Sequence, residues 1–430
     1  MQTRRDFLKT SGQTALSVAA LGTAASRAFA AGSDTLRAGV IGCGGRGTGA
    51  ALNYLESSPG IEIVAMADPF TGRMENAVNE IKKWCEGQKR SSEQCLKVTP
   101  DRMFTGYGGY RRLLALKDVD VVLMAAPPAF RPVHFEEAIK AGKHVFMEKP
   151  VAVDPPGARK VMEVGELARQ KGLVVVAGTQ RRYKKGYREN AYAVSHGAVG
   201  RILSGRIWWC GGALWKHSRE ANESDADYMV RNWVSFAEMS GDHIVEQHVH
   251  NIDIANWFIG KPPRMALGFG GRARRKTGNQ FDFFSVDYEY DDNVVVHSMC
   301  RQVEGCYSRV SEHFVGTEGH LWGDSKVQGK PVTPPAYEDG NEYVIEHREL
   351  IRSIREGRSL NDARAVAEAT MAAIMGRISA YTGQMVKWSD LMETQTSPWY
   401  NLQLTPSARD FEQGTVKAPQ DDVVPIPGRD

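Results

Sequence analysis

The chain has 430 residues, a length that accommodates two domains with full hydrophobic cores. Its 42% hydrophobic and 24% charged residues are typical of a soluble globular protein. The formal net charge of +3 comes from residues 1–30, and the rest of the chain holds 50 basic and 50 acidic residues. This balance argues against binding to nucleic acid or to an anionic membrane through net charge.

Residues 1–30 have the pattern of an export signal. Arg4 and Arg5 precede a mildly apolar run over 14–25, and the stretch ends in Ala28-Phe29-Ala30. This order predicts a twin-arginine signal peptide cleaved after Ala30, and therefore a periplasmic or otherwise exported protein. The apolar run is too short and too rich in small residues to serve as a permanent membrane anchor.

A glycine-rich turn follows an apolar run that begins at Leu36. The turn reads Gly42-x-Gly44-x-x-Gly47, and the residues after it are compatible with a helix. In this order the glycines allow a tight turn, a close approach of backbone to a pyrophosphate, and packing of the helix on the strand. The sequence therefore predicts a dinucleotide site, with phosphates at the helix N-terminus.

A second apolar run, over 61–67, ends at Asp68. A carboxylate in this position accepts hydrogen bonds from ribose hydroxyls and repels a 2′-phosphate, so it favours NAD over NADP. Twin-arginine export carries folded proteins, and no useful pool of free NAD exists outside the cytoplasm. We therefore expect the dinucleotide to be tightly bound and recycled within the site.

Further strands are expected at 119–126, 144–147 and 173–177, with helices at 133–141 and 157–170 between them. This alternation predicts a doubly wound parallel sheet with its ligand at the carboxyl ends of the strands. The cofactor-binding residues expected from it are Gly42, Gly44, Gly45, Arg46, Gly47, Asp68, Ala126, Pro127, His134, Glu148 and Lys149.

Cys85 and Cys95 flank a polar stretch that is expected to be a surface insertion. In an exported protein two such cysteines could form a disulfide, and two free thiols are an equally good interpretation.

From about residue 202 the pattern changes to longer strands without crossover helices, which predicts a large, mostly antiparallel sheet. The strands are expected at 202–210, 264–273, 281–290, 294–303 and 308–316. One helix over 246–258 interrupts them, and two late helices over 343–355 and 362–381 pack back on the protein. The predicted organisation is a signal at 1–30, a Rossmann domain at 35–177, a substrate and oligomerisation domain at 178–390, and an extended strap at 391–430.

The densest polar cluster lies between Asp242 and Asp253. On one helix Glu246 and His250 would share a face, and Asp253 could fix the tautomer of His250. A carboxylate beside a histidine suits removal of a proton from a sugar hydroxyl, and Lys149 could polarise the same oxygen. Metal binding by Glu246 and His250 is a weaker alternative, because no zincin motif is present.

Several further side chains suit recognition of a sugar ring. The expected substrate-binding residues are Arg181, Arg182, Tyr183, Arg231 and Trp233. His243 and His248 are interpreted as packed histidines, and strand alternation should bury one of Trp208 and Trp209.

These stretches together resemble the glucose–fructose oxidoreductase/inositol dehydrogenase (Gfo/Idh/MocA) family over nearly all of residues 36–390. The resemblance rests on the glycine turn, on Glu148-Lys149-Pro150, on 178–183 and on Glu246-x-x-x-His250-x-x-Asp253. It implies a Rossmann domain, a C-terminal α/β domain whose open sheet forms oligomers, and a tightly held NAD(P). It also implies that Lys149, Glu246 and His250 perform catalysis on sugars, polyols or glycosides.

Two departures separate this chain from the family pattern. Glu246 replaces a common Asp, and residues 228–239 replace the family's usual segment before the catalytic helix, so the substrate cannot be carried over. The sequence favours an exported NAD-dependent carbohydrate oxidoreductase, acting for example at C3 of a glycoside. A redox-neutral NAD-dependent glycosidase and a catalytically silent sugar-binding protein are the alternatives.

Overall fold

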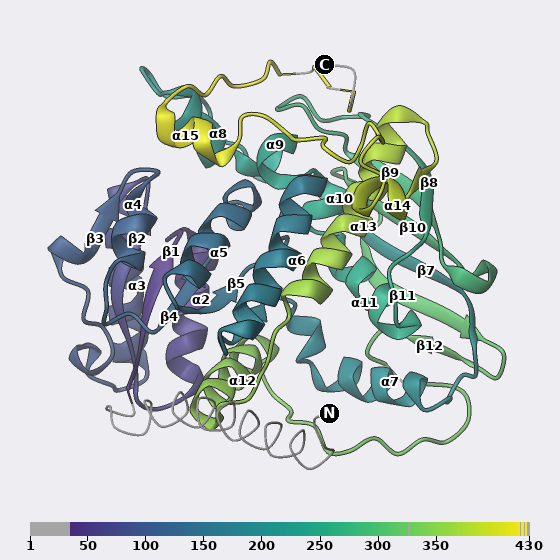
Figure 1. Ribbon diagram of the computed structural model, residues 1–430, viewed down its shortest axis with the longest axis horizontal. Coiled ribbons are helices and arrows are strands. Elements are labelled where there is room, and N and C mark those ends of the chain that lie inside the picture. The colour runs from purple at the N-terminus through teal and green to yellow at the C-terminus, as the bar shows by residue number, and fades with distance from the viewer. Residues whose placement is uncertain (1–34, 326, 422, 425, 428–430) are drawn as a thin grey trace, which may run out of the picture.

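The computed structural model describes residues 35–325, 327–421, 423–424 and 426–427. The predicted signal peptide at 1–30 lies outside these residues. The described chain forms two sheets side by side, each covered by helices, with a long helix between them (Figure 1). Within these ranges no helix is both long and apolar enough to cross a membrane.

The first sheet has six parallel strands in the order β3-β2-β1-β4-β5-β6. Its strands are β1 (Leu36–Ile41), β2 (Ile61–Asp68), β3 (Met103–Thr105), β4 (Val121–Met124), β5 (His144–Met147) and β6 (Val175–Ala177). The central strands are buried on both faces, which explains their continuous apolar sequences. The strand order changes direction at β1, where an open sheet of this type leaves a crevice at its carboxyl edge.

Helices cover both faces of this sheet (Figure 1). One face is covered by α2 (Gly45–Ser57), α3 (Thr71–Gly87) and the late helix α12 (Glu342–Glu356). The other is covered by α4 (Gly109–Leu114), α5 (Arg131–Lys140) and α6 (Pro155–Gln170). The predicted doubly wound architecture is therefore confirmed.

The second sheet has seven strands in the order β12-β11-β7-β10-β9-β8-β13. Its strands are β7 (Ile202–Gly211), β8 (Met265–Gly271), β9 (Phe283–Glu289), β10 (Val295–Gln302), β11 (Arg309–Gly316), β12 (His320–Trp322) and β13 (Val386–Lys387). All neighbours are antiparallel except β7 and β10, which run parallel. The expected antiparallel sheet is thus confirmed in its main part and is mixed at its centre.

The inner face of this sheet packs against α13 (Ala363–Thr382), α10 (His243–Glu246) and α11 (Val249–Ile259). Helix α13 also contacts α6 of the first unit, so it joins the two sheets (Figure 1). The other helices are α7 (Lys185–Ser195), α8 (Asp225–Arg231), α9 (Ala237–Ser240), α14 (Trp388–Met392) and α15 (Ala408–Gln413).

The helix expected over 246–258 is present as α11, but it begins at Val249 and does not include Glu246. Glu246 is the last residue of the short helix α10, while His250 lies at the start of α11. One local and one tertiary contact accompany the break between the two helices. The carbonyl of His243 accepts hydrogen bonds from the amides of both Gln247 and His248, and the His248 ring is bound to the Ser298 hydroxyl at 2.7 Å.

Candidate active site

The glycine turn between β1 and α2 leaves no room for side chains at two positions. Gly42 has a φ of +86°, and a Cβ there would lie 2.4 Å from the amide nitrogen of Ala126. A Cβ on Gly47 would lie 1.8 Å from the carbonyl oxygen of Gly42. Both glycines are therefore required for α2 to start directly against the end of β1.

The N-terminus of α2 opens on a cavity of about 240 Å³. No side chain caps this helix, and a Cβ on Gly44 or Gly45 would meet no atom within 4 Å. Free amides at a helix N-terminus bind phosphate groups. The turn therefore fits a pyrophosphate, in agreement with the sequence prediction.

Asp68 lies at the end of β2 on the wall of the same cavity. Its carboxylate accepts hydrogen bonds from the backbone amides of Cys43 at 2.8 Å and Phe70 at 2.9 Å. Burial raises the pKa of Asp68, while Arg73 and the two amides act in the opposite direction. Each carboxylate oxygen can accept more than one hydrogen bond, so both remain able to receive ribose hydroxyls.

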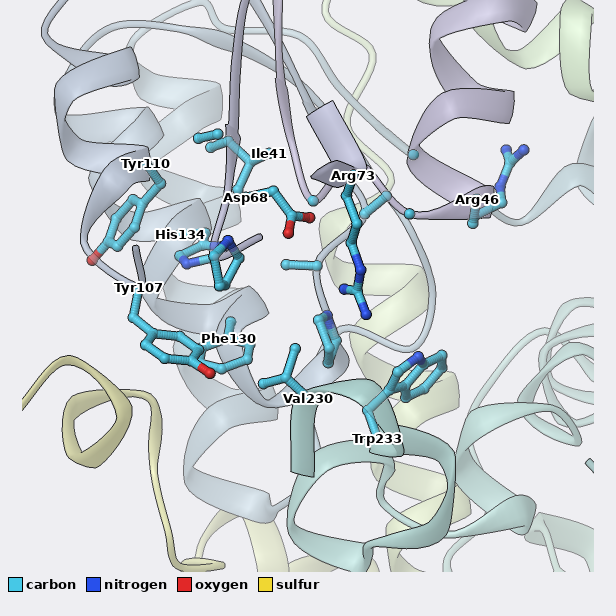
Figure 2. A pocket seen from close by; sticks show the side chains of 18 of the residues that line it. Ile41, Arg46, Asp68, Arg73, Tyr107, Tyr110, Phe130, His134, Val230 and Trp233 are labelled. Atoms are coloured by element: carbon cyan, nitrogen blue, oxygen red, sulfur yellow. The ribbon is translucent and has the colours of Figure 1, made fainter. Parts of the chain in front are cut away.

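Aromatic residues form much of the remaining wall, and the sequence analysis missed most of them. Figure 2 shows Tyr107, Tyr110 and Phe130 around His134, with Trp233 and Val230 projecting from the opposite side to Asp68. The missed lining residues include Arg73, Tyr107, Tyr110, Phe130 and Trp215. Arg73 and Tyr110 lie in the first turns of α3 and α4, and the others lie in connecting segments; none of these stretches carries a cofactor motif, and only folding brings them to one cavity.

His134 lines the cavity as expected, between the rings of Tyr110 and Phe130. Burial, together with the nearby charges of Arg131 and Arg111, lowers the pKa of His134 to about 3. The ring is therefore neutral and offers an apolar face to a bound nucleotide.

Arg46 points from the glycine turn to two buried carboxylates. It forms an ion pair with Glu148, and its guanidinium lies 3.6 Å from the carboxylate of Glu346 and over the ring of Tyr343. Arg46 lines the cavity, as do the other predicted residues of the turn, and Ala126 and Pro127. Glu148 does not appear on the cavity wall, and it acts on the turn through Arg46.

Lys149 follows β5 and reaches α10. Its ammonium donates a hydrogen bond to the carbonyl of Glu246 at 2.8 Å and lies 3.9 Å from the Glu246 carboxylate. Burial raises the pKa of Glu246, and the charge of Lys149 opposes this shift. One oxygen of Glu246 accepts a hydrogen bond from the Gln247 amide at 2.6 Å, and the other is buried without a hydrogen-bond partner among the described residues.

His250 lies close to this pair and stacks on Trp209, with ring centroids 5.6 Å apart. Burial is the largest cause that lowers the pKa of His250 well below its usual value, and the cations Lys149 and Arg181 add to it. The imidazole is therefore neutral near pH 7 and able to accept a proton. The fold thus brings together Lys149, Glu246 and His250, although they do not share one helix.

Asp253 does not fix the tautomer of His250, contrary to the sequence prediction. Both of its oxygens accept hydrogen bonds from the guanidinium of Arg182 at 2.8 Å. The hydroxyl of Tyr183 donates to Asp362 at 2.6 Å. Arg182 and Tyr183 line a separate surface cavity, and their contact with substrate stays a prediction.

Of the remaining predicted substrate residues, Arg181 and Arg231 form ion pairs within the protein, and Trp233 lines the cofactor cavity. Arg181 pairs with the buried Glu312 and lies over the Trp209 ring, which holds it beside His250. Arg231 is bound to Glu220 and Glu223 in the loop before α8.

Trp233 lines the cofactor cavity next to Trp215, whereas Arg182 and Tyr183 line a different cavity. Of the paired tryptophans, Trp208 is buried under Arg309, and Trp209 stacks on His250. His243 and His248 are packed, bonded to the Trp209 carbonyl and to Ser298. Among residues with described positions, no three His, Cys, Asp or Glu side chains gather as metal ligands.

Comparisons with known proteins agree with this geometry. The model of an oxidoreductase family with an NAD-binding Rossmann fold matches residues 36–179, and the GFO/IDH/MocA C-terminal domain model matches residues 187–322. The dTDP-3,4-didehydro-2,6-dideoxy-alpha-D-glucose 3-reductase of Actinomadura kijaniata is 30% identical over 71% of this chain and 78% of its own length.

More distant matches are inositol dehydrogenases. Inositol 2-dehydrogenase of Salmonella typhimurium is 27% identical over 52% of this chain, which spans about half (55%) of that protein. The structure of scyllo-inositol dehydrogenase from Lactobacillus casei with bound NAD(H) and scyllo-inositol has a TM-score of 0.62 at 18% identity. It covers 82% of this chain and 99% of that one, a likeness of fold. With the cofactor turn and both sheets accounted for by these matches, this chain belongs to the GFO/IDH/MocA family of NAD-binding oxidoreductases.

Proposed function

We propose that the protein is an exported NAD-dependent oxidoreductase that transfers hydride between a secondary hydroxyl of a sugar, glycoside or polyol and tightly held NAD. The observation that carries this proposal is the contact of Lys149 with Glu246 beside a neutral His250, at the carboxyl end of β5. The names of the relatives, which are sugar reductases and inositol dehydrogenases, support the same class of substrate. The 3-reductase among them makes C3 the first position to examine.

Oxidation of a secondary alcohol removes two hydrogens, one from carbon as hydride and one from oxygen as a proton. The glycine turn and Asp68 would hold NAD, which would supply the hydride acceptor. His250 takes the hydroxyl proton, because burial keeps its imidazole neutral. The Lys149 ammonium stabilises negative charge on the substrate oxygen as the C–H and O–H bonds break and a carbonyl forms.

Glu246 balances these charges. Its carboxylate lies 3.9 Å from the Lys149 ammonium and would stabilise the imidazolium that forms on His250. The surrounding burial strengthens these interactions relative to water. Asp68 favours NAD over NADP, since a 2′-phosphate beside a buried carboxylate would be repelled.

Retention of the nucleotide is supported by the roof of the cofactor cavity. Trp215, Val230 and Trp233 come from the second half of the chain and complete a wall that begins with the glycine turn. An exported enzyme that cannot draw on a free NAD pool would need such retention. The localisation itself rests on the sequence of residues 1–30.

The open face of the second sheet supports a homo-oligomer. Leu267, Phe269, Val315 and Trp322 are exposed there, with Phe269 68% accessible. Burial of this face against a second copy would remove a large apolar surface from water. Light scattering on wild-type protein and on Phe269→Asp tests it: a dimer or tetramer should shift toward monomer in the variant, and a monomeric wild type would contradict it.

The function is tested by mixing purified mature protein with a panel of glycosides and polyols. We would follow the absorbance of bound reduced nicotinamide and identify the products at the same time. Lasting reduction with a keto product establishes the oxidoreductase. Free sugar without net reduction would establish the redox-neutral glycosidase instead, and no reaction with any of the compounds would favour a silent binding protein.

A further inference from the structure

A second cavity, of about 280 Å³, adjoins the cofactor cavity, and Trp215 lines both. Its walls are formed by 213–216, 274–277 and 302–304, together with Ser235. The last of these segments follows the carboxyl end of β10, beside the end of β7. The cavity therefore lies where the second sheet approaches the cofactor cavity.

Basic side chains dominate this cavity. Lys216, Arg274, Arg275 and Lys276 line it, against the single acid Glu304. Within the described part of the chain, neither Lys216 nor Lys276 has a carboxylate within 4.0 Å. Glu304 is engaged, since its carboxylate accepts the backbone amide of Ala213 at 3.1 Å. A chain that is neutral beyond residue 30 thus gathers four basic side chains at one cavity. The carboxylates of Asp242 and Asp282 act on Arg275, whereas the two lysines have no paired carboxylate in the described chain.

Hydrogen bonds hold the loop that carries Arg274, Arg275 and Lys276 in a fixed shape. The carboxylate of Asp282 accepts hydrogen bonds from the backbone amides of three successive residues, 273, 274 and 275, at 2.7–2.9 Å. Arg272 donates to the carbonyls of Arg275 and Gly278 from the other side. A loop ordered by its own backbone presents its charges in a defined geometry, whereas an unsupported run of lysines would be solvated and mobile.

Arg275 links this cavity to the catalytic groups. Its guanidinium donates to the side chains of Gln302 at 2.6 Å and Gln280 at 3.1 Å, and its Nε is buried without a hydrogen-bond partner among the described residues. Gln280 in turn donates a hydrogen bond to the hydroxyl of Ser240, and the amide of Phe281 donates to Asp242 at the start of α10 at 3.3 Å, so the loop of Arg275 is bonded to the segment that leads into Glu246. A substrate oxidised beside Glu246 can therefore extend one end toward this cavity.

We propose that the cavity is an anion subsite that binds a carboxylate or phosphate carried by the substrate, so that the enzyme prefers acidic sugars. The proposal rests on the proposed oxidoreductase function and adds the substrate class. Trp215 would cover an apolar face of the sugar, while Lys216 and Lys276 bind the anionic group. Hydrogen bonds between charged groups and these donors carry the selectivity.

The test uses matched pairs of ligands: a glucuronide and a glucoside with the same aglycone, and glucose 6-phosphate and glucose. Binding is measured by calorimetry and oxidation by reduction of the bound nicotinamide. The double variant Lys216→Gln/Lys276→Gln removes two charges from the cavity. Lys82→Gln/Lys97→Gln removes two exposed charges from the other domain and is the matched control.

We expect wild-type protein to prefer the acidic member of at least one pair by about tenfold or more in kcat/KM. The cavity variant should lose this preference and its dependence on salt, and the control should keep both. The glucuronide and phosphate pairs show which anion is recognised. Equal oxidation of acidic and neutral sugars by wild type would overturn the subsite and leave the oxidoreductase intact. Acidic sugars that bind through Lys216 and Lys276 without any reduction would overturn the oxidoreductase alone.

Discussion

Lys149 stands at the junction of the two halves of the molecule. It follows strand β5 of the first sheet, and its ammonium binds the end of α10, which packs against the second sheet. The hydrogen bond to the Glu246 carbonyl and the nearby Glu246 carboxylate hold the ammonium where it can stabilise an alkoxide. Its contribution should therefore appear mainly in the rate of the chemical step.

Replacement of Lys149 by Met should lower kcat by about two to four decades, the scale of a lost acid–base or electrostatic group. Binding of NAD and the circular dichroism spectrum should be unchanged. Lys140→Met, at an exposed position of α5, is the control. An unchanged kcat in the Lys149 variant would remove this residue from the mechanism.

The pH dependence should distinguish Glu246 from His250. Burial raises the pKa of Glu246 above its ordinary value and lowers that of His250 well below its ordinary value. The acid limb of kcat/KM in wild type should therefore lie above 4.5, the ordinary value for Glu, and report Glu246. In Glu246→Gln the rate should be low and the limb should move to lower pH, where only His250 titrates. A limb that does not move in this variant would show that the Glu246 charge is not required.

At the scale of elements, the site depends on where helices end. The break between α10 and α11 puts Glu246 and His250 on two short helices, and each is placed by separate tertiary contacts. The sequence places the two residues four apart and predicts a shared face. That prediction failed because helix propensity does not register the bond between His248 and Ser298, which are 50 positions apart.

Cys85 near the end of α3 and Cys95 in the segment after that helix are the two cysteines for which the sequence predicted either a disulfide or two free thiols. The Sγ atoms of Cys85 and Cys95 lie 3.3 Å apart, and both side chains are buried. With glutathione disulfide as oxidant, the two thiols should lose two hydrogen atoms and form a disulfide. Mass spectrometry after denaturation in an alkylating reagent checks this, and the disulfide should add about 2–4 kcal/mol to stability. Two alkylated cysteines after oxidation would favour permanent thiols.

At the scale of the whole molecule, the cofactor cavity is shared between the halves of the chain. Its floor is the glycine turn, and its roof is Trp215, Val230 and Trp233. The C-terminal segment supports both the wall and the roof. Phe411 packs on Tyr107 and Phe130 of the wall, and the amide of Ala418 donates to Asp225 of α8, the helix that carries Val230.

Removal of one roof residue should weaken retention of the nucleotide. Purified wild-type protein should keep its NAD through dialysis, whereas Trp233→Ala should lose it, with affinity reduced on the order of tenfold or more. Tyr307→Ala, an aromatic truncation at an exposed position elsewhere, should behave as wild type. Release of NAD from wild type during simple dialysis would contradict tight binding.

How much of the site the sequence predicts depends on how far apart in the chain the interacting residues lie. The glycine turn, Asp68 and the run into Lys149 are local patterns, in which one strand end and one helix start dictate the residue types. They sufficed for the fold class, the family and the cofactor cavity. The roof tryptophans, the basic cavity at 274–277 and the pairing of Arg182 with Asp253 depend on segments far apart in the chain.

The sequence by itself therefore determined the Rossmann half and its NAD site, because steric demands on backbone near a pyrophosphate act within a dozen residues. Only the tertiary structure decided which charges are free and which are paired. Arg182 and Arg231 are bound to carboxylates, whereas Lys216 and Lys276 have none within reach in the described chain. Pairing is set by the packing of the two halves, and no local pattern records it.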